Sequence, residues 1–204
     1  TVIESRANAN ATVDIINCCV GAEDINDWLN LDGAGWTNVA SKLKANAYRN
    51  SAVQGIIMCH DDLKDPKIDF AAAVSLSNKL VQFIELAKTQ FPKLRQVELF
   101  SRLCEYKITD QKFGTPSGYH TGWANKLTVE HAKQNTGFID GVWVTDRNGY
   151  LWTDGETVRS DGFAFKFAWM KQRETSVHLD TAKQGDDICA DYIFNNLKRY
   201  AWFK

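Results

Sequence analysis

Short apolar runs alternate along the chain with longer amphipathic stretches, and this alternation predicts strands and helices in turn. Val13–Val20 and Ala52–Cys59 are short and almost continuously apolar. Such runs are typical of strands that are buried on both faces of a parallel sheet. Leu94–Ser101 and Asp140–Val144 have the same character and predict two further strands.

The stretches between and after these runs have a helical period. Gly35–Ala47 and Ser117–Gln134 predict one helix each, and Asp69 is placed to cap a long helix that Pro92 ends. The apolar residues of the long helix recur at i, i+3 and i+4: Ala73, Leu76, Leu80, Phe83, Ile84, Ala87 and Phe91. A closing helix carries on one face Cys189, Tyr192, Ile193, Asn196, Leu197 and Tyr200.

The order of these elements predicts one α/β domain over residues 1–204, a doubly wound three-layer sandwich with a mainly parallel sheet. In such sheets the functional crevice lies beyond the carboxyl ends of the strands. Polar residues collect at those ends, in Gly21–Asp24, in His60–Asp62, in Ser101–Glu105 and in the loop that carries His178. We therefore expect Gly21, His60 and His178 to meet on one rim of the sheet.

Composition narrows the classes of partner. The 204 residues are 44% hydrophobic and carry a net charge of −1, which is typical of a globular domain. Positive charges are interspersed with negative ones, and without a basic stripe the sequence gives no electrostatic support for nucleic-acid binding. No apolar run approaches the ~20 residues that cross a bilayer, so we expect no membrane span.

The positions of cysteine and histidine argue against a metal centre. The five cysteines include no C-x-x-C pair, and buried thiols are the simplest interpretation, with one disulfide left open. His60-Asp61-Asp62 lacks a second histidine at ligand spacing, so neither a metal nor another cofactor is expected. His120 and His131 share one helix face, where solvated or hydrogen-bonded roles are the simplest.

Several motifs resemble one enzyme family. A strand ending at Gly21, the segment MCHDD, the segment LRQVELFSR and a late histidine before a helix follow one another in the order typical of SGNH (GDSL-type) hydrolases. The segments FPKLRQVELFSR, YHTGWANKLTVE and YLWTDGETVRSDG resemble those of an uncharacterised group of exported bacterial SGNH-like proteins. The resemblance covers most of the chain and implies an SGNH, flavodoxin-like sheet.

The resemblance implies a serine hydrolase site that this chain matches only in part. Family members use a serine after the first strand, a histidine base, an aspartate three residues before that base, and donors to the oxyanion. His178 stands at the position of the base, and Gly21 at that of the glycine donor. Thr175 occupies the aspartate position, where its hydroxyl cannot stabilise an imidazolium as a carboxylate does. His60 stands where the family has an asparagine donor.

The nucleophile is the largest departure from the family. Ser5 is the only serine before Gly21, and no apolar run precedes it, whereas an elbow nucleophile ends a strand. The resemblance implies that the missing first strand lies between Val13–Val20 and Ala52–Cys59. Because both runs are apolar on two faces, we expect this gap to be filled by an upstream segment or by a strand from another chain. Direct pairing of the two runs is the alternative.

Three functions follow from these matches and departures. The favoured one is a degenerate SGNH-fold domain without esterase activity, in which His178 is structural and the domain is a binding or structural part of an assembly. A serine ester hydrolase of the carbohydrate O-acetyl esterase type, with its nucleophile upstream of Thr1, is the first alternative. The second is a carbohydrate-binding module that stacks sugars on Trp143, Trp152 and Trp169, although core packing is the simpler role for these rings. The ligand is then an acylated compound or a carbohydrate, and the resemblance favours export.

Overall fold

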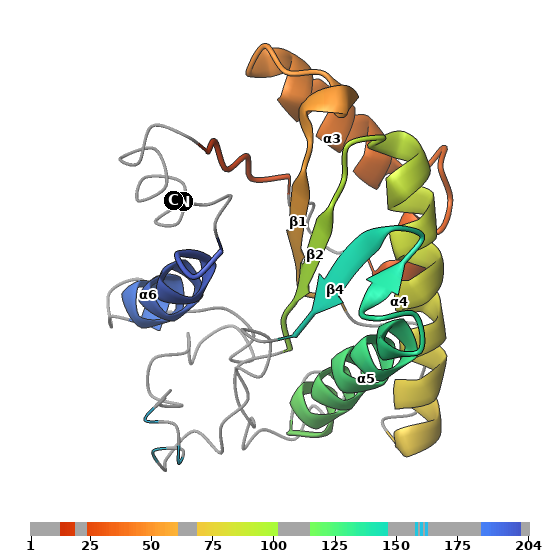
Figure 1. Ribbon diagram of the computed structural model, residues 1–204, viewed down its shortest axis with the longest axis vertical. Helices are drawn as coiled ribbons and strands as arrows, with labels where there is room; N and C mark the ends of the chain where they lie inside the picture. The colour runs from red at the N-terminus through yellow and green to blue at the C-terminus, as the bar shows by residue number, and fades with distance from the viewer. Residues whose placement is uncertain are drawn as a thin grey trace.

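Four short strands form the sheet of the computed structural model, which describes residues 13–18, 24–60, 69–101, 115–146, 158, 160, 162 and 185–200. The strands are β1 (Gly55–Met58), β2 (Gln96–Leu99), β3 (Phe138–Ile139) and β4 (Val142–Thr145), in the order β1-β2-β4-β3 (Figure 1). Both β1 and β4 run parallel to β2, and β3 pairs antiparallel with β4. The predicted α/β class is confirmed, and the four described strands form a mixed sheet with two parallel pairings and one antiparallel pairing.

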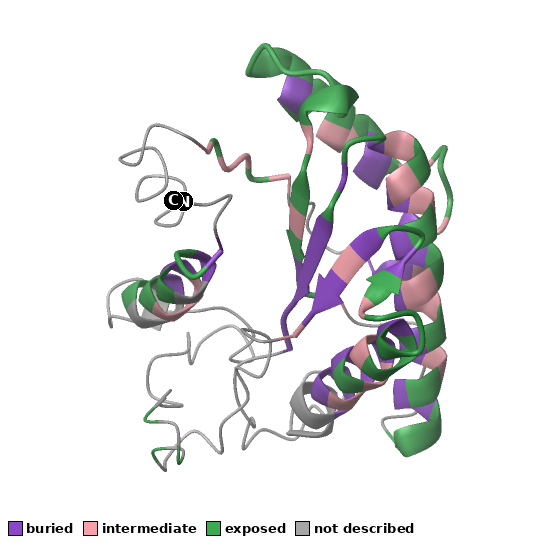
Figure 2. Ribbon diagram, viewed as in Figure 1, coloured by how far each residue is buried: buried purple, intermediate pink, exposed green. Residues whose placement is uncertain are grey.

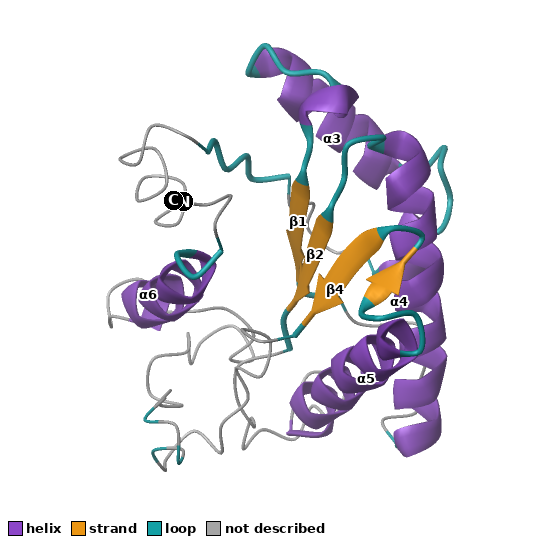
Figure 3. Ribbon diagram, viewed as in Figure 1, coloured by secondary structure: helices purple, strands orange, loops and turns teal. Residues whose placement is uncertain are grey.

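Helices lie on both sides of this sheet (Figure 3). The described helices are α2 (Ile25–Trp28), α3 (Ala34–Ala45), the 3₁₀ helix η1 (Asn50–Ala52), α4 (Phe70–Gln90), α5 (Thr115–Lys133) and α6 (Gly185–Leu197). The long helices α4 and α5 pack against each other on one side, and α2 contacts both α3 and α4. α6 lies on the opposite side of the sheet. This arrangement agrees with a three-layer order of helix, sheet and helix.

The long helix α4 forms where the sequence predicts it. The side chain of Asp69 accepts a hydrogen bond from the backbone N–H of Ala72 at 2.9 Å and so caps the first turn. Leu76, Leu80 and Ile84 recur at helical spacing and are almost completely buried. This stripe carries the packing of α4 onto the sheet, because burying each such side chain contributes roughly 1.5–3 kcal/mol.

Side chains of the strands alternate between two apolar clusters. Val97 and Leu99 of β2 belong to the large cluster formed with α2, α3, α4 and α5. Trp143 of β4 packs against the smaller cluster at α6, which includes Tyr200. We call these two sides of the sheet the α4 face and the α6 face. Figure 2 shows that burial is continuous along β2 and that green, exposed positions occur on β1.

The hairpin that contains β4 differs from the prediction. Asp140 and Gly141 form a turn rather than the start of a strand, since their φ angles are 46° and 73°. Two adjacent positive φ angles are typical of the type I′ turn of a two-residue hairpin. This turn joins the two-residue strand β3 to β4. β3 was not predicted, because a strand of two residues has no detectable period in the sequence.

The prediction of a strand over Val13–Val20 is wrong for residues 13–18. These residues form no strand, and β1 is the outermost strand of the sheet among the residues that the structure describes. The segment is instead attached to the helix side: the Asn38 Nδ2 donates to the carbonyl of Cys18 at 3.1 Å. No backbone hydrogen bond joins residues 13–18 to β1 in the described part of the chain, so direct pairing of the two runs does not occur there.

Candidate binding site

The carboxyl ends of the three parallel strands bring polar residues to one rim of the sheet. His60 follows β1, Ser101 follows β2, and Asp146 follows β4. Burial raises the pKa of Asp146 above its ordinary value. Gly21, Thr175 and His178 lie outside the described residues, so their meeting with His60 stays a prediction.

His60 sits in an aromatic cluster, which we define as His60, Trp28, Trp36, Phe83 and Phe91. The ring of His60 lies 5.5 Å from that of Trp28 and 6.1 Å from that of Phe83. Trp36 stacks on Phe83 at 5.7 Å, and its Nε1 donates to the carbonyl of Trp28 at 3.0 Å. Aromatic pairs at such distances contribute about 0.5–1.5 kcal/mol beyond area burial. The cluster therefore fixes the imidazole of His60 by ring packing.

A cavity of about 680 Å³ lies at the outer edge of β1. The aromatic cluster lines it on the α4 face, and Gln96, Glu98 and Leu197 line it on the α6 face. Residues 13–18 also line the cavity, and we call this segment its far wall. The cavity thus reaches both faces of the sheet around the edge of one strand, and its volume is within the range of about 300–1,000 Å³ that is typical of ligand sites.

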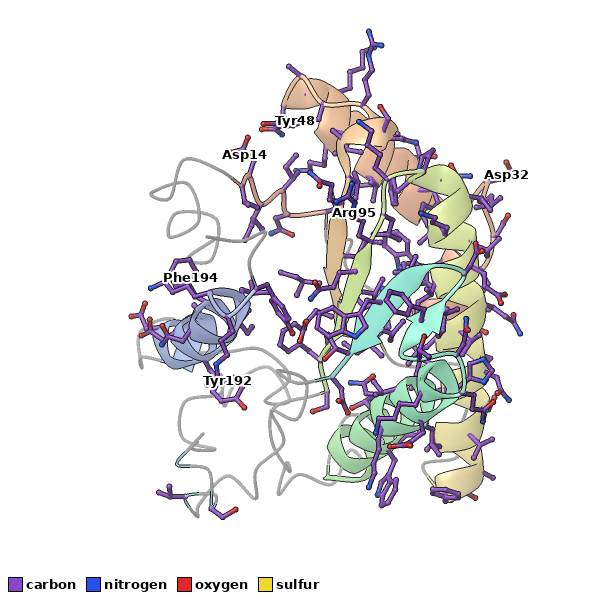
Figure 4. All side chains as sticks on the ribbon, viewed as in Figure 1. Asp14, Asp32, Tyr48, Arg95, Tyr192 and Phe194 are labelled. Carbon is purple, nitrogen blue, oxygen red and sulfur yellow. The ribbon has the colours of Figure 1, made fainter. Side chains whose placement is uncertain are left out.

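The far wall of the cavity packs against both apolar clusters. Val13 and Ile15 pack against the cluster at α6, whereas Ile16 packs against the large core on the α4 face. The hydroxyl of Tyr48 donates to the carboxylate of Asp14, and the two side chains lie together near the end of α3 (Figure 4). This hydrogen bond, together with the negative charge of Asp14, raises the pKa of Tyr48 above its ordinary value. The segment therefore alternates between the two clusters as a strand would, without joining the sheet.

One row of backbone groups on β1 faces the cavity. The carbonyls of Gln54 and Met58 accept hydrogen bonds from the N–H groups of Arg95 at 2.9 Å and Phe100 at 2.8 Å. Consecutive residues of a strand direct their N–H and C=O groups to opposite edges, so those of Gly55 and Ile57 point away from β2. Among the described residues, no strand pairs with β1 on that side. Ile57 is 37% exposed there.

Glu98 is the polar group of the cavity that the sequence analysis missed. It is only 1% exposed in the middle of β2. Its Oε2 accepts hydrogen bonds from the Gln96 Nε2 at 3.1 Å and from the Tyr200 hydroxyl at 3.0 Å. The signal was present in the sequence, because Gln96 and Glu98 alternate with Val97 and Leu99 in a strand that is otherwise apolar. An acid at such a position needs hydrogen-bond donors within the fold.

The remaining chemistry of the cavity wall is simple. Cys18 and Cys59 line the cavity as thiols that form no disulfide, and Cys59 is exposed rather than buried as expected. The carboxylates of the cavity wall are those of Asp14 and Glu98, and the described lining residues include no lysine, arginine or serine. Within the described ranges, no group of three or more His, Cys, Asp or Glu side chains is arranged to hold a metal ion.

The other residues considered from the sequence have packing roles or lie elsewhere. Trp143 packs edge-on against Tyr200, with ring centres 5.6 Å apart, and Trp152 and Trp169 are outside the described residues. His120 is buried in α5, whereas His131 is exposed near the end of the same helix.

None of the helices in the described part of the chain combines the length and the hydropathy needed to cross a membrane.

Comparisons with protein-family models, with curated proteins and with solved structures gave no match for this chain. The α/β class therefore rests on the structure, and the resemblance to SGNH hydrolases rests on the sequence patterns alone.

Proposed function

We propose that this chain is a binding component, a degenerate SGNH-fold domain that holds a ligand in the cavity beside β1 and has no serine esterase activity of its own. The supporting observation is the cavity itself. It surrounds the edge of a strand with aromatic rings on one side and a buried acid on the other. Such a concave, mostly apolar site with a few placed polar groups is the usual form of a binding site.

The chemistry of the lining favours binding over ester hydrolysis. Serine hydrolysis requires a hydroxyl within hydrogen-bond reach of an activating base. His60, the imidazole at this cavity, packs against Trp28 and Phe83, and none of the described lining residues is a serine. A working esterase would therefore need its nucleophile from elsewhere, as the alternative hypothesis with an upstream serine assumes.

Binding of a neutral apolar dye, N-phenyl-1-naphthylamine, tests the proposed site. We expect saturable binding to the wild-type protein, which is measured as an increase in dye fluorescence. Val39→Trp should reduce the affinity at least about tenfold, because Val39 is half-buried and lines the cavity. Val74→Trp is the matched control, since Val74 is exposed on α4 and does not line the cavity.

Two results would contradict the proposal. One is equal dye affinity for the Val39→Trp variant and the wild-type protein. The other is turnover of p-nitrophenyl acetate with a stoichiometric acyl group on a serine of this chain, which would establish the esterase instead.

A further inference from the structure

We propose that the cavity beside β1 receives one extended segment of a partner polypeptide, which joins the sheet as an additional strand. This inference rests on the proposed binding function and specifies its ligand. Three features of the cavity carry it: the backbone groups of β1, the two faces that the cavity reaches, and the position of its far wall.

The backbone of β1 offers a row of hydrogen-bonding groups to the ligand. The N–H and C=O groups of Gly55 and Ile57 face the cavity, and no described strand pairs with them. Natural proteins protect such edges with charged residues, proline or bulges, whereas β1 reads Gly-Ile-Ile-Met. An unprotected apolar edge next to a cavity is a template for strand addition, in which main-chain hydrogen bonds supply much of the affinity.

The two walls of the cavity match the alternation of a strand. Side chains of an added strand point alternately to the two faces of the sheet. On one face they would lie beside His60, the partly exposed member of the aromatic cluster, and on the other beside the exposed side chain of Ile57. A compact apolar ligand could be held on one face of the sheet alone, whereas a strand at the edge of β1 would place side chains on both faces.

The far wall limits the ligand to a single strand. Residues 13–18 stand across the cavity and are held to the helix side by Asn38 and Tyr48. The sheet edge of a second copy of this protein would bring its own neighbouring strands and would collide with that wall. One extended segment of four to five residues, at about 3.3 Å per residue, matches the four residues of β1.

The charge of the lining indicates the composition of this segment. Asp14 and Glu98 are acidic, and no lysine or arginine is among the described lining residues. We therefore infer a strand that combines aliphatic side chains with basic or other hydrogen-bond-donating side chains. Electrostatic complementarity of this kind contributes mainly to the choice of partner.

Titration with the synthetic peptide acetyl-VKVTIKV-amide, followed by residue-resolved amide hydrogen exchange, tests this inference. We expect the peptide to slow exchange of the Gly55 and Ile57 amides by about tenfold or more. The amides of Ile56 and Met58 should be unaffected, since these residues face β2. Alkylation of Cys59, which lines the cavity, should slow in parallel and reports occupancy by any ligand.

Matched peptides and variants separate strand addition from other binding. Replacing both lysines of the peptide by glutamate should weaken binding at least about tenfold. Ile57→Pro removes the outward N–H without removing a bond to β2 and should abolish binding, whereas Ile57→Ala removes the same side chain and should retain it. Urea unfolding of both variants checks that each is folded.

Each remaining outcome would overturn the inference. If the peptide gives no protection of Gly55 and Ile57 in the wild-type protein, or if it protects the Gly55 amide equally in the Ile57→Pro variant, strand addition is wrong. Slow exchange of both amides in the protein alone would mean that the edge is already paired, and peptide-independent dimers would assign it to a second copy. If the dye binds and slows Cys59 alkylation while the peptide protects no amide, the binding function stands and only the strand ligand fails.

Discussion

Glu98 lies in the middle of β2, where almost no solvent reaches it. The Tyr200 hydroxyl that donates to it comes from a residue 102 positions later in the sequence. This hydrogen bond therefore ties the segment after α6 to the centre of the sheet. A buried acceptor that loses such a donor keeps its desolvation cost, and that cost rather than the bond itself decides the effect of a substitution.

Tyr200→Phe should lower the free energy of unfolding by about 1–3 kcal/mol, because the buried Glu98 loses a hydrogen-bond donor. Tyr48→Phe is the control, since Tyr48 is exposed and the loss of its hydroxyl should lower the free energy of unfolding far less than the loss of the Tyr200 hydroxyl does. Urea unfolding of both variants provides the measurement. Equal losses for the two substitutions would show that Tyr200 does not stabilise a buried acid.

The hydrogen bond between Tyr48 and Asp14 predicts a pH dependence for the cavity wall. The folded protein holds the pKa of Tyr48 above its ordinary value of about 10. The stabilisation is therefore complete below about pH 10 and is lost as the pH rises through the raised pKa. The difference in melting temperature between wild-type protein and the Tyr48→Phe variant should be constant from neutral pH to about pH 9 and should vanish at higher pH. A difference that grows with pH would contradict this assignment.

At the scale of elements, β1 and β2 show how differently two similar apolar runs are used. Both were predicted as strands, and both form, over Gly55–Met58 and Gln96–Leu99. All four residues of β2 are buried between two neighbours, whereas β1 has one neighbour among the described strands. Burial of a strand depends on its place in the sheet order, which the composition of the strand does not contain.

Substitution to alanine should reveal this difference. Leu99→Ala on β2 should lower the free energy of unfolding by about 2–5 kcal/mol, because it leaves a cavity in the core. Ile57→Ala on β1 should cost less than about 1 kcal/mol, since Ile57 is 37% exposed. Denaturant unfolding of the two variants checks the order. If Ile57→Ala lowered the free energy of unfolding more than Leu99→Ala does, the outer side of β1 would have to be covered.

Prediction from the sequence was accurate for elements with a strong local signal. The cap at Asp69 and the apolar stripe from Ala73 to Phe91 predicted α4 correctly. The apolar runs predicted β1, β2 and β4. The prediction of a strand was wrong for residues 13–18. Their alternation of apolar residues does not reveal whether a neighbouring strand is present to pair with them. Prediction from the sequence also missed β3, and it missed Glu98 because the partner Tyr200 is close only in the folded chain.

At the scale of the whole molecule, the edge of β1 that no described strand pairs with is the feature that connects the fold to the proposed function. Two apolar clusters cover the two faces of the sheet, and the cavity joins them around that edge. The resemblance to SGNH hydrolases implied a missing strand between Val13–Val20 and Ala52–Cys59 that an upstream segment or another chain would fill, and this stays a prediction. The part of the site that involves Gly21, Thr175 and His178 remains a prediction.

Residue-resolved amide hydrogen exchange of the protein alone is the measurement that bears on this open edge. We predict an alternating pattern along β1: the amides of Ile56 and Met58 are protected by β2, and those of Gly55 and Ile57, which face the cavity, exchange at least about tenfold faster. Uniform slow exchange of all four amides would contradict the prediction, because it would mean that β1 is paired on both sides and that the cavity is not a vacant binding position.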